Sequence, residues 1–195
     1  MYKVIGGVKS RTLRVLWMLE EVGAEYEHVA AAPRSDEVRE HNPSGKIPVL
    51  LVDGEALTDS MAILAFLGDR HGKLSHPAGS IERARQDGLS FRILDEMDAA
   101  LWTAARHSFI LPEEKRVPAV KTTLRWEFEQ ATQYMSNLLG DKPFLMGEDI
   151  TIPDILLTHC LGWAINARFA VEDENLHNYM DRLRSREAFQ RAAAS

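Results

Sequence analysis

The segment from Asn42 to Leu64 reads NPSGKIPVLLVDGEALTDSMAIL, and it holds several structural signals in direct succession. Val49 to Val52 is a short apolar run, Asp53-Gly54 is a strong two-residue hairpin signal, and Ala56 to Thr58 can return antiparallel. Asp59-Ser60 then precede residues with helical apolar spacing, which is typical of a helix N-terminus. The segment therefore predicts a strand, a tight hairpin, a second strand and a helix.

Two features of this segment indicate a binding site. Pro48 opens the first strand, so the residue before it, Ile47, keeps a backbone N–H and C=O that can pair with a ligand, and the Ile-Pro bond can be cis. A helix that starts at Ser60 offers unpaired N–H groups and a positive dipole end, which attract an anion. A ligand with an extended peptide-like backbone and a carboxylate suits both features. The alternative is that Pro48 only starts a strand and Ser60 only caps a helix.

The composition is ordinary for a globular protein, with 45% hydrophobic residues among 195. The formal net charge of −6 leaves no basic footprint, which argues against nucleic acid and anionic membrane as partners. The single cysteine, Cys160, rules out an intramolecular disulfide and any CxxC motif, which fits a reducing compartment. No leader pattern opens the chain and no apolar run approaches the roughly 18 residues that span a bilayer. We therefore expect a soluble, cytoplasmic protein.

Strand and helix signals alternate through the first 72 residues. Tyr2 to Ile5 and Glu27 to Ala31 are typical of strands, while Leu13 to Val22 has helical apolar spacing and Gly23 as its stop. Ser35 to Glu40 indicates a short exposed helix. Together with the opening segment, these elements predict a βαβαββα domain over residues 1–72.

The strand signals stop after a linker, residues 73–80, that contains Gly, Ser, His and Pro. Residues 81–195 are predicted to form an all-helical domain. Its first helix runs from Ile81 to about Phe109, a break follows at Leu111-Pro112, and a second helix with a clean apolar stripe runs from Val117 to Leu139.

A capping box opens a further helix near residue 150. Thr151 can be the N-cap with Asp154 at the third helical position, and Ile150 and Ile155 can form a hydrophobic staple around it. The helix that follows is apolar on most sides and is predicted to be central. Cys160 lies in that apolar set, so we interpret it as a packing residue rather than a reactive thiol.

Four phrases in this order resemble the cytosolic glutathione S-transferase superfamily, in particular its bacterial members. They are SRTLRVLWMLEE at 10–21, NPSGKIPVL at 42–50, TDSMAI at 58–63 and ITIPDILL at 150–157. The resemblance covers essentially the whole chain. It implies a thioredoxin-like N-terminal domain that binds glutathione, and an all-helical C-terminal domain that forms the pocket for an electrophile. It also implies a homodimer, with glutathione as co-substrate and without cofactor or metal.

The resemblance implies specific contacts to glutathione. Ile47, the residue before a cis Pro48, would pair its backbone with the cysteinyl unit. Asp59 and Ser60 would hold the γ-glutamyl end, and Lys46 would lie near the glycyl carboxylate. These implied roles agree with the peptide-like ligand predicted from the residues.

The thiol-activating group is expected at the start of the first helix. Gly6 and Gly7 occupy the strand end where some family members place a Tyr, and no cysteine lies near the helix start. Ser10 is the first candidate and Thr12 the second. Lys9 occupies the position where some classes have their Ser, and the alternative is that Ser10 or Thr12 only caps the helix.

The expected reaction is attack by the glutathione thiolate on a small hydrophobic electrophile, with peroxide reduction as a side activity. Lys9, Arg11 and the helix N-terminus would add positive potential that favours the thiolate. Other hypotheses are a non-catalytic glutathione-binding module and a specialised isomerase or dehalogenase, although the Ser-Ser-Cys-type run of the isomerases is absent. Candidates for the wall of the electrophile pocket are Met97, Leu101, Trp102, Arg106 and Trp163. Met97 and Leu101 could instead be core, and Arg106 could complement a helix dipole.

Overall fold

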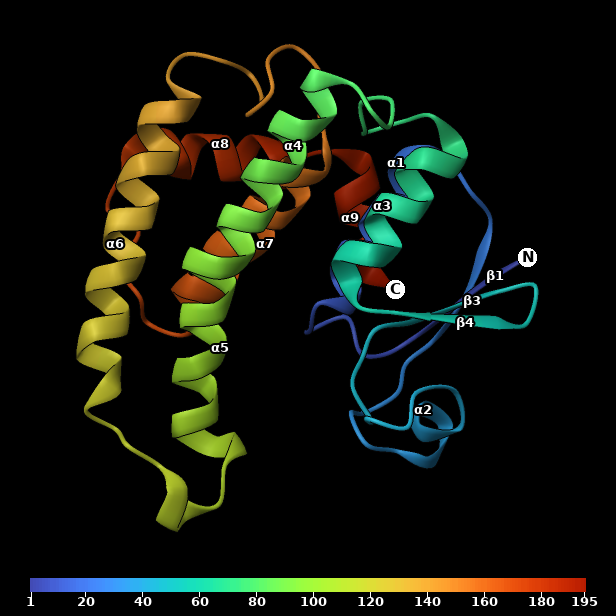
Figure 1. The fold of residues 1–195 in the computed structure, drawn as a ribbon, viewed down its shortest axis with the longest axis horizontal. Helices are drawn as coiled ribbons and strands as arrows, with labels where there is room; N and C mark the ends of the chain where they lie inside the picture. The colour runs from blue at the N-terminus through green and yellow to red at the C-terminus, as the bar shows by residue number, and fades with distance from the viewer. The chain divides into compact units, whose positions relative to one another are not determined.

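The computed structural model describes residues 1–195, which form two compact units (Figure 1). The first unit combines residues 1–80 with residues 184–195, and the second comprises residues 81–183. Residues 184–195, which the sequence assigns to the helical domain, group with the first unit in the structure.

The first unit is built on a four-stranded sheet with the order β2-β1-β3-β4. The strands are β1 (Tyr2–Ile5), β2 (Tyr26–Val29), β3 (Val49–Val52) and β4 (Glu55–Thr58). β1 pairs parallel with β2 and antiparallel with β3, and β3 pairs antiparallel with β4 through the predicted Asp53-Gly54 hairpin. This mixed sheet is the thioredoxin-like arrangement that the resemblance implies.

Three helices complete the βαβαββα order: α1 (Thr12–Val22), α2 (Asp36–His41) and α3 (Ser60–His71). Gly23 ends α1 in the left-handed conformation with φ 74°, as its sequence position predicts. A small core under the sheet joins Ile5, Val38 of α2 and Val49, and the side chain of Ile47 packs against it. The apolar side chain of Ile47 is thus directed into this core.

The C-terminal helix α9 (Glu187–Ala194) packs on α1, and this contact explains why it belongs to the first unit. Phe189 meets the ring of Trp17 edge-on at 5.0 Å between centroids. Arg186 donates to both carboxylate oxygens of Glu21 at 2.6 and 2.7 Å, and the Glu21 side chain is only 7% exposed. These partners lie far apart in sequence, so no local pattern predicts their contact.

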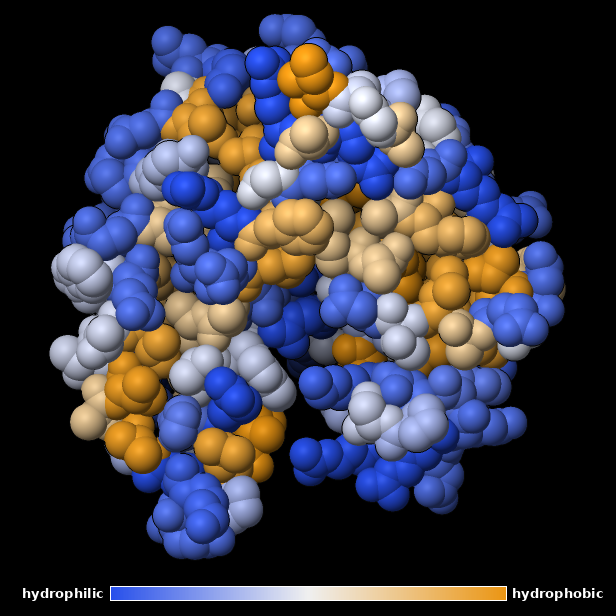
Figure 2. Space-filling view, viewed as in Figure 1, coloured by the Kyte–Doolittle hydropathy of each residue, from blue (hydrophilic) through white to orange (hydrophobic).

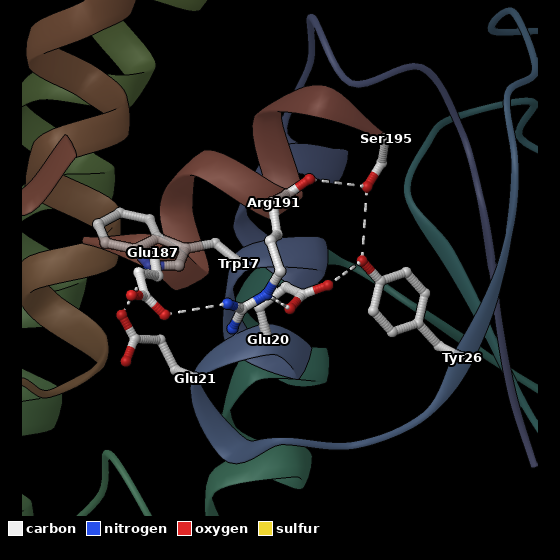
Figure 3. Close-up of polar contacts among 7 residues, drawn as sticks. All are labelled: Trp17, Glu20, Glu21, Tyr26, Glu187, Arg191 and Ser195. Atoms are coloured by element: carbon white, nitrogen blue, oxygen red, sulfur yellow. Dashed lines mark hydrogen bonds and ion pairs between the residues drawn. The ribbon is translucent and has the colours of Figure 1, made fainter. Parts of the chain in front are cut away.

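A second polar group ties α9 to α1 and β2 (Figure 3). Arg191 of α9 donates to Glu20 at 2.6 Å, and Tyr26 of β2 donates to the same carboxylate at 2.7 Å. Burial raises the pKa of Tyr26 above its ordinary value, and the Glu20 carboxylate raises it further. Tyr26 therefore remains a hydrogen-bond donor at neutral pH.

The second unit is helical throughout. Its elements are α4 (Ile81–Arg92), the π-helical η1 (Ile93–Asp98), α5 (Ala99–Ala105), the π-helical η2 (Arg106–Ile110), the short 3₁₀ η3 (Glu113–Lys115), α6 (Val120–Leu139), α7 (Ile152–Asn166) and α8 (Glu174–Arg184). The segments α4, η1, α5 and η2 follow one another without a gap and correspond to the single helix predicted from Ile81 to about Phe109. Leu111, with an extended backbone, ends them before Pro112. The two π-helical segments have no sequence signal that distinguishes them from α-helix.

The predicted capping box is present at the start of α7. The Thr151 N–H donates to Asp154 Oδ2 at 2.8 Å, while the Leu145 N–H and the Tyr179 hydroxyl donate to Oδ1 at 2.8 and 2.6 Å. The pKa of Asp154 is raised above its ordinary value because the carboxyl is buried, although the hydrogen bonds from these donors act to lower it. Cys160 is fully buried in the same helix, as the packing interpretation predicts.

Several apolar side chains remain exposed in the second unit. Figure 2 shows apolar surface at the lower left, over the part of the molecule where α5 and α6 end in Figure 1. In the segment between these two helices, Phe109 and Val117 are 68% and 55% exposed. No helix is both long and apolar enough to cross a membrane. No group of three or more His, Cys, Asp or Glu side chains is arranged to hold a metal ion.

Candidate functional site

The turn between β1 and α1 carries the two candidate hydroxyls. Ser10 Oγ lies 2.7 Å from the carbonyl oxygen of Gly7 and 3.0 Å from Thr12 Oγ1, to which it can donate. It also accepts the Thr12 N–H at 3.1 Å, so Ser10 satisfies a donor of the first helical turn. Thr12 is fully buried and Ser10 is part-buried. Of the two hydroxyls, Ser10 is therefore the one a ligand reaches more easily.

Gly6 brings this turn against the Ile47-Pro48 segment. A Cβ placed on Gly6 would lie 2.3 Å from Thr12 Oγ1, a distance that real Cβ atoms do not show, and 3.0 Å from Ile47 Cβ, which is a tight contact. Gly6 also has φ +141°, which L-residues rarely adopt. Because residue 6 is a glycine, the candidate hydroxyls and Ile47 can approach each other directly.

The peptide bond between Ile47 and Pro48 is cis. The pairing of β3 begins at Val49, so neither the N–H nor the carbonyl of Ile47 takes part in the sheet ladder. Both groups therefore remain available to an extended ligand, as the position before Pro48 predicts.

Asn42 shapes the loop that leads to Ile47. Its Nδ2 donates to the carbonyl oxygen of Lys46 at 2.8 Å, and its Oδ1 accepts the N–H and the hydroxyl of Ser44 at 3.2 and 2.8 Å. The Asn42 side chain thus closes an Asx turn around the loop. The amine-bearing side chain of Lys46 is exposed.

The N-terminus of α3 forms the third part of the site. Asp59 has φ +70° and caps the helix, since its Oδ1 accepts the Met61 and Ala62 N–H groups at 2.8 and 3.2 Å. Ser60 is buried, and its Oγ accepts from Nη1 of the fully buried Arg14 at 3.4 Å. Asp59 is exposed, so its carboxylate can cap the helix and still face a cationic group of a ligand.

Positive charge dominates the start of α1. Lys9 is exposed and Arg11 is part-buried, and the first turn of the helix holds no acidic residue. The positive end of the helix dipole adds to these side chains. A thiol beside Ser10 would therefore meet a potential that favours its thiolate form.

The candidates for the electrophile pocket all belong to the second unit. Met97 and Leu101 are fully buried, in agreement with the alternative that they are core residues. Trp102, Arg106 and Trp163 are part-buried. Arg106 Nη2, at the start of η2, donates to Thr103 Oγ1 of α5 at 3.0 Å. The ring of Trp163 lies 6.3 Å from that of His159. Their role in a pocket stays a prediction.

A thioredoxin-like unit with a cis-proline loop, followed by a helical unit, defines the glutathione-transferase class of fold. Residues 10–70 match the family model for the glutathione S-transferase N-terminal domain, and residues 96–187 match that for the C-terminal domain. The chain belongs to the glutathione S-transferase family.

Individual relatives agree with this assignment. The glutathione S-transferase GstA of Escherichia coli O157:H7 is 30% identical over 158 residues, which cover 79% of this chain and 75% of the relative. A maleylacetoacetate isomerase of Rhizobium meliloti (strain 1021) is 39% identical over 90 residues, 43% of this chain and 42% of that protein. The crystal structure of a glutathione transferase family member from Pseudomonas fluorescens Pf-5, with two glutathione bound, superimposes with a TM-score of 0.84 at 20% identity, covering 98% of this chain and 92% of the other.

Three residues that contact parts of the site were not predicted to do so: Asn42, Arg14 and His28. Asn42 stands in the quoted segment next to Pro43, which is a turn signal in itself. Arg14 carries a charge and would therefore be expected on the solvent-facing side of α1, yet it is fully buried. His28 contacts the Gly6 carbonyl oxygen, and this contact has no signal in the sequence.

Proposed function

We propose that this protein is a glutathione transferase that conjugates the glutathione thiolate to small hydrophobic electrophiles. The observation that carries the proposal is the close approach of the Ser10–Thr12 turn to Ile47 across Gly6. Backbone that can hold the cysteinyl unit thereby lies next to hydroxyls that can donate to its sulfur. This arrangement is needed if one residue binds the cysteine of glutathione and another activates its thiol.

Glutathione would lie extended over the first unit. Its cysteinyl backbone would pair with Ile47, and its γ-glutamyl carboxylate would meet Ser60 and the N-terminus of α3. Asp59 would accept from the γ-glutamyl ammonium, and Lys46 would attract the glycyl carboxylate. Each of these contacts joins opposite charges or a hydrogen-bond donor to an acceptor. Several of them are charge-assisted hydrogen bonds, which are stronger than those between neutral groups.

The hydroxyl of Ser10 would turn from the Gly7 carbonyl to donate to sulfur. If the site lowers a thiol pKa of roughly 8.5 by about two units, the thiolate fraction at about pH 7 rises about twentyfold, for about 2.7 kcal/mol. Nucleophilicity falls with pKa along a slope of about 0.4 to 0.5, so the net gain from activation is only a few-fold. Most of the acceleration must then come from holding the electrophile beside sulfur, which assigns specificity to the helical unit.

Turnover of a chloronitrobenzene with glutathione tests this function. Ser10→Ala should lower kcat and leave glutathione affinity nearly unchanged, and Thr12→Val is the matched variant for the second hydroxyl. An unchanged rate in Ser10→Ala would remove Ser10 from the mechanism and move the role to Thr12 or to backbone N–H groups. Protein that binds a glutathione matrix yet conjugates none of a broad electrophile panel would support the non-catalytic binding module instead.

The similarity to a maleylacetoacetate isomerase over 90 residues keeps glutathione-dependent cis–trans isomerisation as a second candidate function. In that reaction the thiolate adds to the substrate and leaves again, so the same Ser10 turn would serve it. Conversion of maleylacetoacetate without net loss of glutathione would favour the isomerase, whereas formation of a stable conjugate with the chloronitrobenzene would favour the transferase.

We also propose that the protein acts as a homodimer. Exposed aromatic side chains of α6, Trp126 and Tyr134, line an open groove of about 610 Å³ together with α4, η1 and α5, and this groove offers apolar surface to a second copy. Light scattering of the purified protein should give about twice the monomer mass of 22.0 kDa. Trp126→Glu should shift the mass toward the monomer.

A further inference from the structure

We propose that His28 is a positioning residue for thiol activation, because its imidazole fixes the Gly6 carbonyl and thereby the placement of the Ser10–Thr12 turn. The inference rests on the proposed transferase function. His28 belongs to β2, outside the loops that form the glutathione site, and its action on the thiol is exerted through Gly6.

The hydrogen bond replaces a missing step of the sheet ladder. β1 and β2 pair in parallel as far as Ile5 and Val29, and the Gly6 N–H continues the ladder by donating to the Val29 carbonyl oxygen at 3.0 Å. The Gly6 carbonyl has no donor from the β2 backbone, and His28 Nε2 lies 2.8 Å from it instead. A carbonyl oxygen only accepts, so Nε2 carries the hydrogen. Both polar groups of Gly6 are thus held by β2, one by its backbone and one by His28.

Gly6 transmits this constraint because nothing separates it from the site. The Thr12 hydroxyl and Ile47 both lie where a Cβ of residue 6 would stand, at 2.3 and 3.0 Å from that position. Ser10 Oγ lies 3.0 Å from the same Thr12 hydroxyl. A rotation of the Gly6 peptide would therefore move the hydroxyls relative to the backbone that holds the cysteinyl unit.

The geometry sets the expected consequence. A hydrogen bond from a hydroxyl to sulfur weakens steeply with distance and angle, so a small displacement of the turn reduces thiolate stabilisation. The groups that would hold the γ-glutamyl and glycyl ends, Asp59, Ser60 and Lys46, lie on other elements and would keep their places. Loss of the His28 bond should then raise the pKa of the bound thiol and lower kcat, while the KM for glutathione changes little.

Two amide variants, His28→Gln and His28→Asn, separate the effect of the hydrogen bond to Gly6 from the effects of side-chain polarity and of folding. Gln places its amide nitrogen the same number of bonds from Cα as Nε2 of histidine, whereas the amide of Asn is one bond shorter and does not reach Gly6. Tyr26→Phe is the matched control, since it removes a hydrogen bond of the same strand, to Glu20 at 2.7 Å, without touching Gly6. Melting temperatures of all variants establish that each is folded at the temperature of the assay.

The readouts are the pKa of enzyme-bound glutathione, from ultraviolet absorbance of the thiolate against pH, and the separate kcat and KM values. We expect His28→Asn to raise the thiol pKa by about one unit, which is about tenfold less thiolate below that pKa, and His28→Gln and Tyr26→Phe to keep the wild-type value. A thiol pKa in His28→Asn equal to wild type, or equal losses in His28→Gln and His28→Asn, would overturn the role of His28 alone. A wild-type protein that leaves the thiol pKa of glutathione unchanged would overturn the proposed function and this inference together.

Discussion

Asp59 carries two separable roles, and substitution can measure each one. As the cap of α3 it accepts two backbone N–H groups through Oδ1, at 2.8 and 3.2 Å. As the proposed partner of the γ-glutamyl ammonium it supplies a negative charge. Asparagine keeps the cap and tolerates the positive φ of this position, whereas alanine keeps neither the cap nor the charge.

The magnitudes follow from these contacts. Loss of an N-cap costs about 1 kcal/mol, so Asp59→Ala should lower the melting temperature by about 2 to 4 °C for a chain of this length. Asp59→Asn should remain within about 0.5 kcal/mol of wild type, because Asn and Asp are nearly equal as caps. A hydrogen bond to a charged group is worth about 1.5 to 3 kcal/mol, so both variants should bind glutathione at least about tenfold more weakly.

Calorimetric titration with glutathione and thermal melting measure the two quantities on the same samples. Wild-type affinity in Asp59→Asn would refute the contact between Asp59 and the γ-glutamyl ammonium. A wild-type melting temperature in Asp59→Ala would refute the cap. A variant that loses affinity but not stability is the result expected for Asp59→Asn.

Three further perturbations test the framework around the site. Backbone strain alone should make Gly6→Ala less stable by about 1 to 3 kcal/mol. The total loss should be larger, because the new Cβ would also meet the Thr12 hydroxyl at 2.3 Å, and denaturant unfolding measures it. Burial raises the pKa of Asp154 above its ordinary 3.8, so the native state holds the proton of this carboxyl more tightly than the unfolded state does. The stability that this group contributes therefore falls as the pH rises from about 3.8 through the raised pKa. The unfolding free energy of the wild type should fall over that range relative to that of Asp154→Asn, in which residue 154 does not titrate. A double-mutant cycle on Glu21 and Arg186 should give a coupling of about 1.5 to 3 kcal/mol, since two charge-assisted hydrogen bonds join them and Glu21 is nearly buried. A coupling near zero would mean that this ion pair does not help to hold α9 on α1.

The sequence predicted those parts of the fold that depend on local signals. Asp53-Gly54 forms the hairpin, α3 begins at Ser60, and Thr151 with Asp154 opens α7, because turns and helix starts are decided by residues within a few positions of each other. The cap of α3 is Asp59 rather than the predicted Ser60. The Ile47-Pro48 bond, which was expected to be able to adopt the cis form and is cis, also lies within this short segment.

The parts that the sequence did not predict depend on contacts between distant residues. The return of α9 to α1 rests on Arg186 and Glu21, which are 165 positions apart. Tyr179 completes the hydrogen bonds of Asp154 from another helix. His28 meets the Gly6 carbonyl only because the parallel register sets Val4 beside it. No periodicity or capping rule reports such pairings.

The central claim is that the first unit holds glutathione with its sulfur beside the Ser10–Thr12 turn. A crystal structure of the protein with glutathione bound tests this claim most directly. We expect the sulfur within about 3.5 Å of Ser10 Oγ, with the cysteinyl backbone paired to Ile47. Glutathione bound across Ile47 with its sulfur out of reach of both Ser10 and Thr12 would contradict the proposed activation, and glutathione bound away from Ile47 would contradict the site itself.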